Sequence, residues 1–333
     1  MILSRRHLLP SATAAALVPA AARGQARELR IGIQPGLTYL PVVVAQHEKL
    51  IEKRAKEAGL GDITVTWNRV AGGNVLNDAL LAGAMDCAGT GFPSFLILWS
   101  RGRGKQAIKG LVSYGNAPLL LLSRNPEVKA ITDFGDADRI TVPAVKSSVQ
   151  AILLQIAADK QWGQWDRLDR LTVSRSHPDA IAALLSMRGE INASFSAPPY
   201  QYQALEHREL HVVTTSDEIF GGPCSNGMLY MTEAFHDANP ALARAVNLAV
   251  RDGIALVNAD PKAAAHMYIR TSGETIDPAL ALQTVTARGT KFEAGPRGLM
   301  RFAEFMRKTG AIAKTPTSWK DAFFAEAHDL DGS

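Results

Sequence analysis

Short apolar segments alternate with amphipathic ones along most of the chain. Segments rich in β-branched and other apolar residues predict strands, and the first of them, at 29–33, runs into the turn Gln34-Pro35-Gly36. This alternation is typical of α/β architecture. The other expected strands are at 63–67, 84–89, 139–142, 168–173, 191–195 and 210–215, with further apolar segments at 107–112 and 118–123.

The segments between the strands have helical spacing. In 147–161, Val149, Ile152 and Ile156 recur at intervals of three and four residues, which predicts one buried helix face. Two similar strand–helix blocks are followed by a helical tail from Thr232 onward, and we expect the crossings between the blocks near 118–123 and 224–231. The expected helices are at 41–59, 73–82, 93–100, 178–187, 199–207, 238–258, 261–270, 278–288, 296–308 and 318–324.

The first 26 residues have a different pattern. They carry three arginines and no acidic residue, and a weakly apolar stretch with small residues follows the pair Arg5-Arg6. This order is typical of a secretory signal, and the paired arginines are similar to the twin-arginine export signal. The stretch is too short to cross a bilayer. We therefore expect an export signal at 1–26, cleaved after Ala26 or Ala22, and a soluble periplasmic protein; the alternative is a basic cytosolic tail.

The formal net charge of +4 on 333 residues does not by itself indicate nucleic-acid binding. Three of the positive charges are the arginines of 1–26, so the chain beyond Ala26 carries a formal charge of +1. The basic cluster at 101–105 has no interleaved aromatic residues, and we interpret it as a solvated turn. A composition of 47% hydrophobic and 20% charged residues excludes a disordered chain, and the length fits two domains.

No segment has the motif of a hydrolase, a metalloprotease or a phosphate loop. A Gly-x-Ser-x-Gly elbow does not occur, and the pair His47-Glu48 lacks the second histidine of a zinc protease. Cys87 and Cys224 are the only cysteines, and we expect both to be free thiols. We therefore expect no catalysis, no cofactor and no metal.

The segment 69–93 has a specific order of residue types. The pair Gly72-Gly73 opens a helix that ends before Gly83, a short strand around Asp86 follows, and the strand runs into Gly89-Thr90-Gly91. This order resembles the periplasmic substrate-binding proteins of ABC importers, in the nitrate, sulfonate and taurine branch.

A second block, 179–200, repeats the same order, with Asn192 where the family usually has aspartate. Segments 302–306 and 318–324 are also similar to the C-terminal helices of that family. The resemblance covers roughly residues 28–325. The matching motifs indicate the fold and the branch of the family, but they do not indicate the ligand.

The resemblance implies the type II periplasmic binding protein fold, an α/β fold with two α/β lobes around a central cleft and extended hinge crossings. Lobe 1 would comprise 27–118 and 228–333, and lobe 2 would comprise 119–227. The resemblance also implies hinge closure on a small-molecule ligand, followed by docking on an ABC permease in the inner membrane. We expect a monomer with no nucleic-acid partner.

Polar loops follow the predicted strands in both blocks. Ligands of open α/β sheets lie beyond the carboxyl ends of strands, where glycines permit close approach and free N–H groups at helix starts favour anions. These loops contain no acidic residue, so we predict a small anionic ligand of sulfonate, nitrate or carboxylate type. The candidate ligand-binding residues are Gln34, Thr38, Tyr39, Gly73, Asn74, Thr90, Gly91, Ser147, Ser148, Ser194, Pro199, Tyr200, Ser225 and Asn226.

Other interpretations of the same residues stay open. Gly73-Asn74 and Ser147-Ser148 are also ordinary helix-capping pairs, and Arg69 and Arg175 follow strands and could supply a cation to an anionic ligand. The protein could also be a sensor that presents its bound state to a membrane receptor, or a pyrimidine-precursor binding protein. Enzymes related to the latter use a cysteine-rich iron motif that two isolated cysteines cannot supply.

Overall fold

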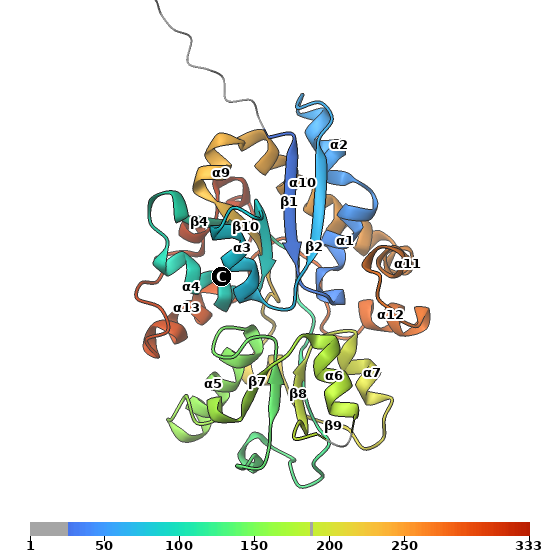
Figure 1. Cartoon of the computed structure of the whole chain (residues 1–333), viewed down its shortest axis with the longest axis vertical. Coiled ribbons are helices and arrows are strands. Elements are labelled where there is room, and N and C mark those ends of the chain that lie inside the picture. The colour runs from blue at the N-terminus through green and yellow to red at the C-terminus, as the bar shows by residue number, and fades with distance from the viewer. Residues whose placement is uncertain (1–25, 187–188) are drawn as a thin grey trace, which may run out of the picture.

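A computed structural model describes residues 26–186 and 189–333 (Figure 1). The expected export signal therefore lies outside the described residues except for Ala26, and the end of the expected helix 178–187 lies outside them too. The described chain forms two lobes, each built on one five-stranded sheet. In this part of the chain, no helix combines the length and the apolarity that crossing a membrane requires.

The first sheet has the strand order β2-β1-β3-β10-β4 and is parallel except for β10, which is antiparallel to both neighbours. Successive residues of β10 alternate between two cores, because Met228 and Tyr230 pack on one face while Leu229 and Met231 pack on the other. The strands are β1 (Glu28–Ile33), β2 (Thr64–Arg69), β3 (Cys87–Thr90), β4 (Ile108–Ser113) and β10 (Met228–Thr232).

The second sheet has the order β7-β6-β8-β5-β9, and here β5 is antiparallel to both neighbours. The two sheets thus share one plan, in which the first strand after each crossing is the reversed one. The strands are β5 (Leu120–Ser123), β6 (Ile140–Val142), β7 (Thr172–Ser174), β8 (Ala193–Ser196) and β9 (His211–Thr215).

Two expectations about the strands are wrong in detail. The segment expected as the strand 168–173 contains a 3-10 turn at Asp169–Leu171, and β7 begins only at Thr172. The crossings run through 114–119 and 221–227, so four of the six residues of 118–123 belong to β5 and four of the eight residues of 224–231 belong to β10. An apolar run of four or five residues is compatible with a buried strand and with an extended crossing. These two runs are buried on both faces, as expected for a strand.

Helices cover both faces of the first sheet, and the helical tail completes this lobe (Figure 1). The tail helices α10 and α11 pack on α1, and α13 packs on α4. The helices are α1 (Leu40–His47), α2 (Leu50–Glu57), α3 (Gly73–Leu81), α4 (Phe92–Arg101), α5 (Val149–Trp162), α6 (His177–Leu185), α7 (Tyr200–Leu205), α8 (Ser216–Phe220), α9 (Glu233–Ala238), α10 (Pro240–Ala259), α11 (Pro261–Ser272), α12 (Pro278–Val285) and α13 (Leu299–Lys308).

The helix expected at 41–59 is two helices. Lys49 adopts a left-handed φ of 51°, which ends α1 and starts α2 at a new angle. The expectation for the cysteines is confirmed, because Cys87 and Cys224 are free and buried. Burial raises the pKa of Cys224 to about 12, so this thiol is neutral at physiological pH.

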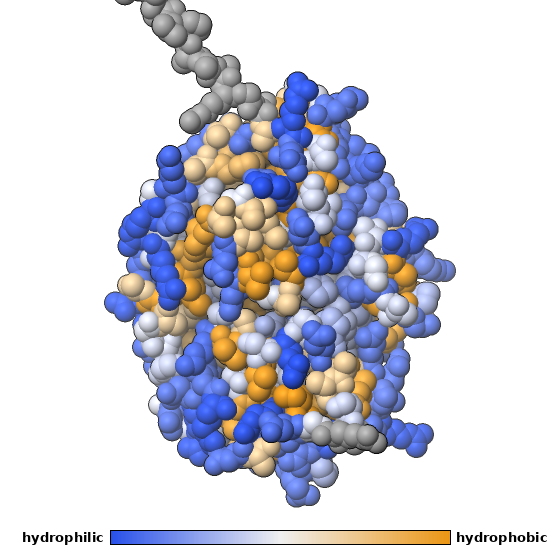
Figure 2. All heavy atoms as spheres, in the orientation of Figure 1, coloured by the Kyte–Doolittle hydropathy of each residue, from blue (hydrophilic) through white to orange (hydrophobic). Residues whose placement is uncertain are grey.

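The surface in Figure 2 is largely hydrophilic, with apolar side chains gathered around α3 and on both sides of the seam between the lobes. Leu81, at the end of α3, and Val145, in the loop after β6, are each 37% exposed. Large exposed apolar side chains near a cleft often belong to a binding surface. The seam between the lobes therefore has the exposed apolar surface expected of a binding site.

Candidate functional site

A small cavity lined mostly by buried residues, here called the inner cavity, lies where the carboxyl ends of strands from both lobes meet. Its volume is about 40 Å³. Since one water molecule needs roughly 10–15 Å³ measured in this way, the inner cavity has room for about three waters or for the head group of a small polar solute.

Eight of the fourteen candidate residues line the inner cavity, and they come from both lobes and from a hinge crossing. No Asp, Glu, Lys or Arg side chain is among the described residues that line it. The eight candidate residues are Gln34, Thr38, Tyr39, Gly73, Thr90, Gly91, Ser148 and Asn226.

Four helices begin at the inner cavity, two from each lobe. Gly73 is the first residue of α3, Gly91 is the N-cap of α4, Ser148 is the N-cap of α5, and His177 is the first residue of α6. Helix N-termini carry partial positive charge and unpaired N–H groups, so their convergence favours a bound anion although no cationic side chain is present. The Ser148 hydroxyl also caps its own helix by accepting from Ala151 N at 3.2 Å, as the capping interpretation expected.

Glycine at position 73 permits the close contact between α3 and its neighbours. A Cβ atom there would lie 2.4 Å from Thr90 Oγ1 and 2.6 Å from Ser94 Oγ. Both side chains line the inner cavity, so any larger residue at 73 would change the shape of its lining.

His177 lines the inner cavity as a neutral ring. Its burial lowers its pKa to about 4, because the charged form loses its hydration there. The ring stacks on Tyr200 with centroids 5.9 Å apart. Burial also raises the pKa of Tyr39 to about 12, and its hydroxyl donates to Gly89 O at 3.2 Å. Both groups can therefore offer neutral hydrogen bonds at physiological pH.

A carboxylate clasp lies beside the inner cavity, next to His177. The Tyr200 hydroxyl donates to Glu274 Oε2 at 2.6 Å, and Tyr268 donates to Glu274 Oε1 at 2.7 Å. Burial, reinforced by the Glu274 charge, raises the pKa of Tyr200. Because Tyr200 belongs to the second lobe and Tyr268 to the helical tail, the clasp holds the lobes together.

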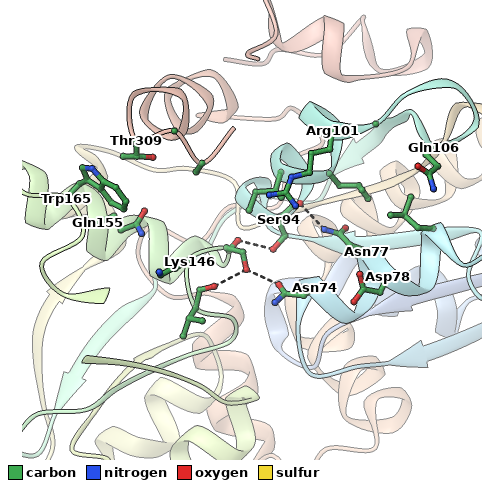
Figure 3. Close-up of a pocket in the computed structure, with 18 residues that line it drawn as sticks. Asn74, Asn77, Asp78, Ser94, Arg101, Gln106, Lys146, Gln155, Trp165 and Thr309 are labelled. Atoms are coloured by element: carbon green, nitrogen blue, oxygen red, sulfur yellow. Dashed lines mark hydrogen bonds between the residues drawn. The ribbon is translucent and has the colours of Figure 1, made fainter. Parts of the chain in front are cut away.

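A hydroxyl latch borders the inner cavity at Ser94. Ser94 Oγ donates to Ser147 O at 2.9 Å, and Ser147 Oγ donates to Asn74 Oδ1 at 2.8 Å (Figure 3). Beyond the latch lies a larger open space, here called the outer groove, between α3 and α4 on one side and Val145–Ser147, Gln155 and Trp165 on the other. The candidates Asn74 and Ser147 line this outer groove rather than the inner cavity.

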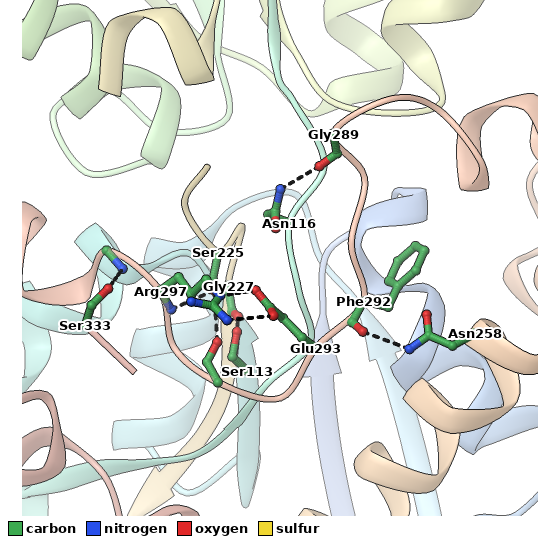
Figure 4. Close-up of polar contacts among 12 residues, drawn as sticks. Ser113, Asn116, Ser225, Gly227, Asn258, Gly289, Phe292, Glu293, Arg297 and Ser333 are labelled. Atoms are coloured by element: carbon green, nitrogen blue, oxygen red, sulfur yellow. Dashed lines mark hydrogen bonds and ion pairs between the residues drawn. The ribbon is translucent and has the colours of Figure 1, made fainter. Parts of the chain in front are cut away.

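The hinge crossings are fixed by the loop that precedes α13 (Figure 4). Asn116 exchanges two backbone hydrogen bonds with Lys291, and the Ser225 hydroxyl accepts from Arg297 N at 3.0 Å and donates to Gly295 O at 3.3 Å. Ser225 thus supports the hinge and does not line the inner cavity. Asn226 does line it, while its amide Nδ2 donates to Ala117 O in the other crossing at 3.0 Å.

The remaining candidates lie beside the inner cavity without lining it. Ser194 is a buried residue of β8, and Pro199 and Tyr200 stand at the start of α7 behind His177. Arg69 donates to Gln46 Oε1 at 3.4 Å, and Arg175 is exposed. The ligand-binding role of all fourteen candidates stays a prediction.

Sequence reasoning missed three polar residues of the inner cavity, namely Ser94, Gln150 and His177. Each lies in the first turn of a helix, where side chains stand next to the capping N–H groups. The signal for His177 was the N-cap Ser176 before it, whose side chain accepts from Asp179 N. The helix was expected to begin at Pro178, one residue after its observed start, so His177 was left out of the candidates.

The geometry can bind and enclose a solute. Among the described residues, no group of three His, Cys, Asp or Glu side chains is placed to hold a metal ion.

The sequence matches the NMT1-like family over residues 22–270, about three quarters of the chain. The chain belongs to the NMT1-like family. No curated protein matches the sequence.

Solved structures place this NMT1-like protein in the periplasmic binding protein fold with two lobes. The alkanesulfonate-binding protein SsuA from Xanthomonas axonopodis pv. citri, bound to MOPS, is 17% identical, with 87% of this chain and 96% of that chain covered and a TM-score of 0.70. The periplasmic nitrate-binding protein NrtA from Synechocystis PCC 6803 is 13% identical, with 92% and 89% covered and a TM-score of 0.70. At these identities the similarity shows the fold, and the expected fold class is confirmed.

Proposed function

We propose that this protein is the solute-binding component of an ABC importer, exported to the periplasm, which closes its two lobes on a small organic or inorganic anion. The observation that carries the proposal is the convergence of four helix N-termini on a small, largely buried cavity that no charged side chain of the described residues lines. Family membership and the sulfonate- and nitrate-binding structures with the same fold support it.

Binding rather than catalysis fits the residues that line the inner cavity. They supply neutral hydrogen-bond donors, and His177 is neutral at physiological pH because its pKa is lowered to about 4. A neutral cavity with oriented N–H groups selects against cations, since a cation would meet the positive ends of the helices. We propose that the protein acts as a monomer and delivers its closed, liganded form to a membrane permease.

Titration calorimetry of the purified protein with nitrate, methanesulfonate and acetate tests this function, with spermidine as the cationic control. We expect at least one anion to bind and spermidine not to bind. A ligand present at 100 times its dissociation constant should add about 2.7 kcal/mol to the free energy of unfolding, measured by thermal shift. Small-angle scattering should show compaction with the bound anion. Binding of spermidine alone, or no compaction with any ligand, would contradict the proposal.

A further inference from the structure

The outer groove is far larger than the inner cavity and adjoins it directly. Its volume is about 650 Å³, against about 40 Å³ for the inner cavity, and Ser94 lines both. A volume of 650 Å³ lies within the range of small-molecule sites, whereas 40 Å³ accommodates only a head group.

The outer groove is formed by regular helix faces. On α3 the residues that line it are Asn74, Asn77, Asp78 and Leu81, spaced at three and four residues. The face of α4 that lines it has the same spacing and ends at Arg101. Residues with this spacing share one side of a helix, so both helices present a continuous surface to the outer groove.

The wall between the two spaces is the hydroxyl latch. It consists of the hydrogen bonds Ser94 Oγ to Ser147 O and Ser147 Oγ to Asn74 Oδ1, at 2.9 and 2.8 Å. Both are neutral hydrogen bonds near the surface, each of which contributes little net stability. A ligand could therefore displace the latch at small cost.

The outer groove has apolar surface to cover. Leu81 of α3 and Val145 of the loop after β6 both line it and are each 37% exposed. Trp165 lines it from the second lobe (Figure 3). Covering such surface with hydrocarbon is favourable in proportion to the area removed from water.

The outer groove also contains a buried acceptor without a donor. Gln155 is 3% exposed, and its Nε2 donates to both carboxylate oxygens of Asp169 at 3.0 Å. Its Oε1 is buried and has no hydrogen-bond partner among the described residues. Buried polar atoms are rarely left unpaired, so this oxygen indicates a ligand group that donates a hydrogen bond.

We propose that the outer groove binds the apolar body of an elongated organic anion whose anionic head occupies the inner cavity, and that Gln155 Oε1 accepts a hydrogen bond from a hydroxyl or amine at its far end. This inference rests on the proposed function and narrows its substrate class to amphipathic anions. Inorganic anions such as nitrate would fill the inner cavity alone.

Calorimetry with a series of alkanoates and a matching series of alkanesulfonates tests the inference. From butanoate through hexanoate to octanoate, we expect the affinity to rise about three- to fourfold for each methylene that is buried. We expect 6-hydroxyhexanoate to bind about two- to tenfold more tightly than hexanoate, because its hydroxyl can donate to Gln155 Oε1. Gln155→Met should remove this preference for the hydroxyl.

A matched pair of variants on α3 locates the effect. Leu81→Gln introduces a polar group into the outer groove and should lower octanoate affinity about threefold or more while leaving butanoate affinity unchanged. Val75→Gln is the control, because Val75 is 52% exposed on the same helix and does not line the outer groove.

The outcomes separate the two claims. Affinity that is independent of chain length and unaffected by Leu81→Gln overturns the role of the outer groove and leaves the proposed function standing. Binding of nitrate alone likewise overturns the role of the outer groove and leaves the proposed function standing. If no nitrate, carboxylate or sulfonate binds, the proposed function itself fails.

Discussion

The inner cavity and the outer groove are formed by the same two lobes but differ in their chemistry. The inner cavity is small and lined mostly by buried residues, and the ends of four helices supply its polarity. The outer groove is open, and Arg101, Lys146 and Asp78 place full charges along it. Oriented N–H groups in an enclosed space act at low dielectric, whereas charges at an open rim are screened by water and salt. The inner cavity thus suits recognition of a charged group, whereas the outer groove suits recognition of shape.

Filling the inner cavity should have the largest effect. Gly73→Ala places a Cβ atom 2.4 Å from Thr90 Oγ1 and 2.6 Å from Ser94 Oγ, so side chains that line the inner cavity must shift. Overpacking of this kind costs about 1–3 kcal/mol, which corresponds to a loss of up to about 100-fold in anion affinity by calorimetry. Gly135→Ala is the control, because its Cβ would have Asp138 Oδ2 at 4.0 Å as its nearest neighbour. Equal affinity in Gly73→Ala and Gly135→Ala would show that the ligand head lies elsewhere.

His177 should make the inner cavity, unlike the outer groove, sensitive to acid. Its pKa is lowered from 6.5 to about 4 by burial, so between these values the unfolded chain binds a proton that the folded protein excludes. The free energy of unfolding should therefore be intact above pH 6.5 and fall by up to about 3 kcal/mol as the pH drops to 4.

Urea unfolding from pH 7 to pH 4 measures this effect. Paired carboxylates also titrate near pH 4, so the informative quantity is the difference between the wild-type protein and His177→Gln. The variant should lose less stability over this range. Parallel pH profiles of the two proteins would show that His177 is not the group responsible.

Loss of the carboxylate clasp, which lines neither the inner cavity nor the outer groove, should have an intermediate effect. Tyr200→Phe removes the donor to Glu274 Oε2 but keeps the ring that stacks on His177. Hydrogen bonds to charged groups contribute about 1.5–3 kcal/mol, and the bond from Tyr268 to Glu274 remains, so a loss near 1.5 kcal/mol is expected.

Small-angle scattering and calorimetry should show a more open unliganded protein and about tenfold weaker anion binding in Tyr200→Phe. Tyr202→Phe, on the same helix, is the control, because no hydrogen bond of the Tyr202 hydroxyl is seen within the described residues. An unchanged scattering profile in Tyr200→Phe would mean that the clasp does not hold the lobes closed.

The sequence predicted most of the inner cavity because glycines, hydroxyls and N-caps follow strands in a recurrent order. Gly73, Thr90 and Gly91 could be found in this way, since their roles depend on local backbone geometry. Asn74 and Ser147 could not be separated from them, because a shift of one residue along a helix start moves a side chain from the inner cavity to the outer groove.

The outer groove itself was not predicted. The apolar pattern of the helix at 73–82 places Val75 with Leu76 and Leu80, yet Val75 is 52% exposed while the other two are buried. The pattern indicates the face that packs on the sheet. The opposite face of α3 acquires its role only when the second lobe and the turn after α13 come next to it, and these contacts are distant in sequence.

The smallest predicted effect belongs to Lys146, at the rim of the outer groove. Lys146 has a φ of 59°, in the left-handed region, where a side chain costs about 1 kcal/mol. Lys146→Gly relieves this strain, but glycine is also more flexible in the unfolded chain, so a net gain of about 0.5 kcal/mol in the free energy of unfolding is expected.

Lys146→Ala is the matched control, because it removes the charge and keeps the strain. Urea unfolding should rank the glycine variant above the alanine variant, with butanoate affinity equal in both, since neither change reaches the inner cavity. A glycine variant less stable than the alanine variant would mean that this rim is not strained, and a change in butanoate affinity would mean that the two spaces are not separate.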